Sequence, residues 1–132
     1  NFYKSKNYDK IERSNLWPKF PPTSCISIKR NYLIKILKEF KIKKYNLLAI
    51  DFRLAVISKF LFNNYQVLDS HYTYYYQDKK GSENSNYKKY SKNWWLRRNQ
   101  AHNYMVYLFK KRKNKYQNFD FTFTKFINSL IE

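Results

Sequence analysis

The sequence is poor in cysteine, glycine and acidic residues, and it lacks long apolar runs. One cysteine among 132 residues excludes a disulfide framework and a cysteine-based zinc cluster, so a reducing cytoplasm is the expected setting. The lone glycine, Gly81, leaves no glycine-rich phosphate loop, and no G-x-S-x-G nucleophile turn is present. No apolar run reaches the roughly 18 residues of a membrane-spanning helix.

The scarcity of acids gives the chain a strong positive charge. Nine Asp and Glu residues stand against 27 Lys and Arg, for a formal net charge of +18, which indicates a polyanionic partner. Aromatics at 21% and hydrophobics at 43% exclude a disordered basic tail, so we expect a folded domain. Lysine outnumbers arginine 21 to 6, which points to A/T-rich coding bias and weakens a nucleic-acid interpretation.

Hydrophobic periodicity predicts a mainly helical chain with a few short strands. A polar lead-in, residues 1–16, precedes a strand at 23–28, and two further strands are expected at 66–69 and 72–76. The first helix is expected to bury one face formed by Leu33, Ile34, Leu37 and Phe40. The predicted helices span residues 30–40, 46–62 and 86–112, and a shorter apolar element at 119–131 closes the chain.

The long predicted helix carries a polar cluster within its apolar stripe. Arg98 shares a face with Trp94, Trp95 and His102, at spacings of three and four residues. A buried arginine needs an anion, because an unpaired charge is costly to desolvate. One interpretation is an internal arginine–carboxylate pair or a side chain reaching solvent. The other is a cleft where Arg98, with Arg97 and His102, holds a phosphate while a tryptophan stacks on a ring.

Asp51 raises the same question on the second predicted helix. Leu47, Leu48 and Leu54 lie three or four residues away, so the acid has apolar neighbours. A carboxylate in such a setting acts as a general base or forms a structural ion pair, for which Arg98 is a candidate partner. The two histidines match no metal motif, and no metal ligands are predicted.

Four segments follow one another along the chain: Phe20-Pro-Pro-Thr-Ser-Cys-Ile-Ser-Ile28, Leu48-Ala-Ile-Asp-Phe-Arg-Leu54, Tyr72-Thr-Tyr-Tyr-Tyr76, and Trp94-Trp-Leu-Arg-Arg98 with Ala101-His102. Their order resembles the C-terminal half of a GT-A-type, family-2-like bacterial glycosyltransferase. This resemblance implies an α/β, Rossmann-like fold, mainly helical in this portion. Residues 17–112 would be its acceptor-side half and 113–132 a C-terminal apolar element, with the nucleotide-sugar-binding half absent.

The resemblance also implies an activity and a site. A glycosyltransferase of this kind moves sugar from a nucleotide-diphosphate sugar to a glycan or lipid-linked acceptor in cell-surface polysaccharide synthesis, by an inverting mechanism. The donor and a divalent Mg or Mn ion would need the missing half, so this fragment alone is expected to be inactive. By resemblance, Asp51 is the base, Thr23 and Ser24 line the cleft, Arg97, Arg98 and His102 lie near the diphosphate, and Trp94 or Trp95 meets the acceptor.

Two other functions remain open from the residues. A small basic nucleic-acid-binding module would use lysines on phosphates and the Tyr72–Tyr76 run as a stacking surface. Peripheral attachment to an anionic membrane is compatible with the glycosyltransferase hypothesis, since many acceptors are lipid-linked. The expected location is the cytoplasm, with peripheral attachment to the inner membrane as a compatible addition.

Overall fold

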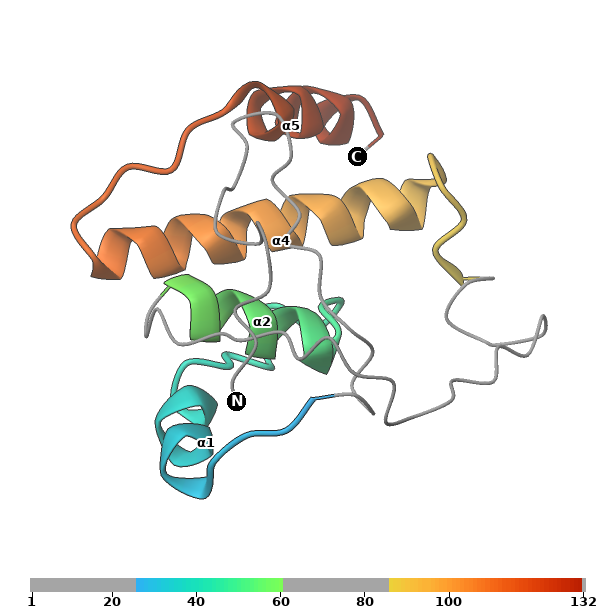
Figure 1. Ribbon diagram of the computed structural model, residues 1–132. Helices are drawn as coiled ribbons and strands as arrows, with labels where there is room; N and C mark the ends of the chain where they lie inside the picture. Colours follow the sequence, from blue (N-terminus) through green and yellow to red (C-terminus); the bar gives the residue numbers. More distant parts are fainter. Residues whose placement is uncertain (1–25, 61–85, 132) are drawn as a thin grey trace, which may run out of the picture.

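The computed structural model describes residues 26–60 and 86–131, which form four α-helices. They are α1 (Arg30–Leu37), α2 (Ile50–Phe60), α4 (Lys92–Lys111) and α5 (Phe119–Ile131). In Figure 1 they follow one another as layers, with α1 at one end, α2 and α4 in the middle and α5 at the other end. Each helix packs against the next in that order.

The predicted α/β fold is wrong for the described part of the chain, which is all-α and contains no strand. Residues 26–28 of the predicted 23–28 strand belong to neither a strand nor a helix. The alternation there reflects packing, because Ile26 and Ile28 lie half-buried against the core while Ser27 is exposed. The strands predicted at 66–69 and 72–76 lie outside the described residues.

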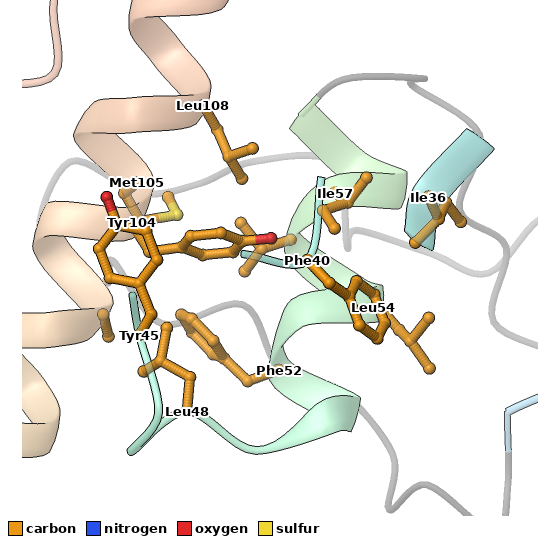
Figure 2. Close-up of a cluster of buried hydrophobic side chains, with 12 residues drawn as sticks. Ile36, Phe40, Tyr45, Leu48, Phe52, Leu54, Ile57, Tyr104, Met105 and Leu108 are labelled. Atoms are coloured by element: carbon orange, nitrogen blue, oxygen red, sulfur yellow. The ribbon is translucent and has the colours of Figure 1, made fainter. Parts of the chain in front are cut away.

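Helix α2 is the centre of the molecule. Every residue from Phe52 to Ile57 is buried, so α2 is covered all around rather than along one stripe. Figure 2 shows Tyr104, Met105 and Leu108 of α4 pointing toward α2. The core joins α1, the segment after it, α2 and α4 through Ile36, Phe40, Tyr45, Leu48, Phe52, Leu54, Val56, Ile57, Ala101, Tyr104, Met105 and Leu108.

The buried face of α1 differs from the predicted one. Ile36 is buried on the helix and Phe40 just after it, whereas Ile34 and Leu37 are about half exposed. Helix α1 has only eight residues. A small rotation of such a short helix about its own axis is enough to change which aliphatic side chains face α2. The prediction was right for Phe40 and wrong for Ile34 and Leu37.

Helix ends follow local chemistry that the hydrophobic pattern does not contain. Helix α4 begins at Lys92 rather than at 86, because the Ser91 hydroxyl accepts the Trp94 N–H at 3.2 Å and caps the first turn. Tyr90, just before it, has a φ of 68°, and Lys113 just after the helix has a φ of 57°. Such left-handed positions favour glycine, yet this chain has a tyrosine before α4 and a lysine after it.

Candidate functional site

The predicted site residues that the structure describes lie on two helices, α2 and α4. Trp94, Trp95, Arg97, Arg98 and His102 all lie on α4. Asp51 lies in the first turn of α2, half-buried, where its Oδ1 accepts the N–H of Phe52 at 2.7 Å. Thr23 and Ser24 lie outside the described residues, so the predicted cleft lining has no structural description.

Arg98 and His102 meet a carboxylate from α5 that the sequence analysis did not select. The Arg98 guanidinium forms an ion pair with Asp120, in the first turn of α5. The His102 Nε2 lies 3.0 Å from the same Asp120 oxygen, and its Nδ1 lies 2.9 Å from the Tyr116 hydroxyl. These four side chains, Arg98, His102, Tyr116 and Asp120, form a polar seam joining α4, the following loop and α5.

The seam holds His102 as a neutral imidazole at pH 7. Its side chain is fully buried, and this desolvation lowers the pKa of His102 to about 4, with Asp120 opposing the shift and Arg98 adding to it. The Asp120 carboxylate beside Nε2 favours the tautomer with the proton on that nitrogen, which leaves Nδ1 to accept from the Tyr116 hydroxyl. Burial likewise raises the pKa of Tyr116 to about 12, so its hydroxyl stays protonated as the donor.

This arrangement defines what the seam can do chemically. The Arg98 guanidinium contacts a carboxylate, which is the internal pair given above as one of two interpretations. A phosphate ligand would have to compete with Asp120 for Arg98. The described geometry therefore ties α5 to α4 electrostatically.

Aromatic side chains continue from the start of α4 onto α5. Tyr90 meets Trp94 edge-on at 5.5 Å between centroids, and Trp94 meets Trp95 at 4.7 Å. Trp95 meets Phe123 of α5 at 5.9 Å, and Phe123 stacks on Phe119 at 6.1 Å. Both tryptophans are half-buried, so this series of rings covers the outer side of the α4–α5 contact.

Two cations of α4 also lie over aromatic rings. The Arg97 guanidinium lies 4.4 Å from the Tyr87 centroid, and that of Arg98 lies 5.0 Å from the Trp94 centroid. Arginine and tryptophan thus contact each other on α4, as their shared face predicted.

Helix α5 turns polar groups inward and apolar ones outward. Thr124 and Asn128 are buried, and the Asn128 amide donates to the Trp95 carbonyl of α4 at 3.2 Å. Four apolar side chains of α5 are exposed to solvent: Phe119 by 84%, Phe123 by 42%, Phe126 by 57% and Leu130 by 66%. We call these four residues the exposed row of α5. Their spacing of four, three and four residues places them on one helix face. The other apolar side chains of α5, Phe121, Ile127 and Ile131, are half-buried. Helix α5 therefore carries more apolar side chains than its contact with α4 covers.

The sequence contained the signal for this row but not its direction. The 3.6-residue periodicity of Phe119, Phe123, Phe126 and Leu130 is readable, and the segment was predicted as an apolar closing element. Periodicity alone does not say which side of a helix meets the protein. The sequence indicated that Arg98 needs an anion, but it did not indicate which of the nine acidic residues supplies it.

Arg53 is a further polar residue that sequence analysis missed. It is buried among the core side chains of α2, and its guanidinium donates to the carbonyls of Phe40, at 2.7 Å, and Tyr45. Burial lowers the pKa of Arg53. The contacts satisfy two carbonyls of the α1–α2 connection, which indicates a structural role for this cation.

Two further features bear on the chemistry. Among residues 26–60 and 86–131, no group of three or more histidine, cysteine or acidic side chains could hold a metal ion. Over the same ranges, no helix combines the length and the apolar character needed to cross a bilayer.

The described part of the chain defines an all-α protein with a layered helix arrangement. No protein-family model matches the chain, and neither a curated protein nor a solved structure matches it. The glycosyltransferase activity therefore stays a prediction from resemblance, while the α/β fold that the resemblance implied is corrected to all-α for the described residues.

Proposed function

We propose that this protein attaches peripherally to an anionic membrane surface, with the exposed row of α5 as its apolar anchor. The carrying observation is the outward orientation of Phe119, Phe123, Phe126 and Leu130 on a chain of net charge +18. An interfacial helix has this form, with phenylalanine and leucine entering the acyl boundary while nearby cations meet anionic headgroups.

Basic residues precede α5 along the chain. The run Lys110-Lys111-Arg112-Lys113, with Lys115, ends α4 and leads into α5, and each of these side chains is exposed. The structure describes only three carboxylates, of which Asp120 pairs with Arg98 and Glu39 with Lys111. The acids therefore offset little of the positive field that an anionic bilayer would meet.

The positive charge and the exposed apolar surface together favour an anionic membrane over other candidate partners. Nucleic acid accounts for the charge but does not require a four-residue apolar row that spans about 16 Å of helix. A second copy of the chain would cover the row but would bring +18 against +18. An anionic bilayer satisfies both the apolar row and the charge.

Liposome flotation tests this proposal. The chain should float with vesicles containing about a third anionic lipid and remain behind with neutral phosphatidylcholine vesicles. The double substitution F126S/L130S removes two exposed side chains with little effect on folding, because both face solvent. Since burying each would contribute about 1 kcal/mol, we expect roughly 30-fold weaker binding.

Two controls make the result specific. Ile50→Ser removes an exposed aliphatic side chain on α2 and should leave the affinity within about twofold. Single-stranded DNA in a gel-shift assay probes the alternative polyanion, and its binding should be insensitive to F126S/L130S. The proposal fails if anionic vesicles do not bind the chain, or if F126S/L130S binds them as tightly as the native chain does.

A further inference from the structure

The opposite end of the helix layers carries a second apolar and basic face. Ile34 and Leu37 of α1 are exposed by 52% and 51%, three residues apart on one side of the helix. Ile42, in the segment that follows, is exposed by 60%. We call Ile34, Leu37 and Ile42, with the lysines around them, the α1 face.

Lysines dominate the charge of the α1 face. Five of them are exposed between residues 35 and 44, namely Lys35, Lys38, Lys41, Lys43 and Lys44. The acid in this stretch, Glu39, accepts from the Lys111 ammonium at 2.5 Å and from the Tyr107 hydroxyl at 2.8 Å. These contacts with α4 engage the Glu39 carboxylate, which leaves the lysines to set the potential of this end.

The α1 face and the exposed row of α5 lie at opposite ends of the molecule. Helix α1 packs on α2, α2 on α4, and α4 on α5, and Figure 1 shows α1 and α5 as the two outer layers. At about 8–10 Å between neighbouring helix axes, the two outer helices are roughly 25–30 Å apart. A bilayer that is flat on this scale and covers α5 leaves the α1 face directed away from it.

We propose that the α1 face binds a second anionic bilayer, so that the protein bridges two membrane surfaces. The inference rests on the proposed function for α5 and adds a second site of the same chemistry. Charge complementarity selects the occupant: exposed aliphatic side chains interspersed in sequence with exposed lysines fit an anionic lipid surface, whereas another copy of this chain would be repelled.

Vesicle clustering measures bridging separately from binding. The full chain is added to vesicles of about 100 nm with a third anionic lipid, and particle size is followed by dynamic light scattering while bound protein is measured by flotation. The native chain should float and should raise the apparent particle size severalfold. Ile34→Ser with Leu37→Ser should still float, with affinity changed less than about threefold, but clustering should fall to the level without protein.

Two variants and one measurement without lipid complete the test. Ile50→Ser should cluster vesicles like the native chain, while F126S/L130S should float more weakly than the native chain and should no longer cluster vesicles. Circular dichroism should show the same helix content in all variants, since each changed side chain faces solvent. Sedimentation without vesicles should give a monomer.

The outcomes distinguish the two proposals. Native flotation without clustering overturns bridging and leaves the attachment through α5 standing. Clustering by I34S/L37S equal to native clustering also overturns bridging, because the α1 face is then unnecessary. A dimer in sedimentation that I34S/L37S abolishes assigns the α1 face to a second copy and overturns it too. Failure of the native chain to float refutes both proposals.

Discussion

The buried imidazole of His102 should make the stability of the fold depend on pH. Its pKa is about 4 in the folded chain and about 6.5 when unfolded. The unfolded chain therefore binds more protons between those values, so lowering the pH through this range favours unfolding. The His102 contribution is fully present above pH 6.5 and disappears as the pH falls to 4.

The size of this effect follows from the two pKa values. Proton linkage between pH 7 and pH 5 removes about 2 kcal/mol from the free energy of unfolding, and about 3 kcal/mol is lost by pH 4. A small domain has about 5–15 kcal/mol in total, so the loss is readily measurable. The pKa of Glu39 is lowered by its contacts with Lys111 and Tyr107, and its contribution is lost only below about pH 4.5. Among the described residues, the interval from pH 7 to pH 5 therefore reports on His102.

Urea unfolding, followed by tryptophan fluorescence, measures this dependence at pH 7, 6 and 5. The His102→Gln variant has no titrating imidazole, so it should be less stable at pH 7 but nearly independent of pH over this interval. Parallel pH profiles for the native and His102→Gln chains would refute the argument. A native chain that gains stability on acidification would show that His102 is charged beside Asp120 in the folded state.

Two further substitutions test the polar contacts between helices. Arg53→Met should lower the free energy of unfolding by about 3 kcal/mol in urea titrations, because it leaves the buried carbonyls of Phe40 and Tyr45 without their donor. Glu39→Gln should cost less than about 1 kcal/mol in the same assay, because its partner Lys111 is well exposed to solvent. Equal losses for the two variants would contradict the difference in burial.

The sequence predicted where the helices lie along the chain better than it predicted where they begin and which side chains they bury. The closing element at 119–131 is a helix with those bounds, and the long helix lies inside its predicted range. Its beginning moved to Lys92, because capping by Ser91 and the left-handed Tyr90 override the apolar periodicity. Tyr104 is buried on α4, although helical spacing from Trp94, Ala101, Met105 and Leu108 did not select it as part of the apolar stripe.

The seam shows why the candidate site could be predicted only in part. The grouping of Arg98 with His102 followed from helical spacing within α4. Their anion, Asp120, comes from a different helix, and pairing between helices depends on the crossing of α4 with α5. Sequence spacing contains no information on that crossing, so the partner of Arg98 required the structure.

The direction of α5 follows from the seam and in turn produces the exposed row. Asp120, Thr124 and Asn128 recur at intervals of four residues and so lie on one side of α5. Asp120 must face α4 to meet the Arg98 guanidinium and the His102 imidazole, and Asn128 must face it to reach the Trp95 carbonyl. Once that side is turned inward, the helical period places Phe119, Phe126 and Leu130 toward solvent. The polar seam therefore orients the apolar surface through which we propose that the protein meets a membrane.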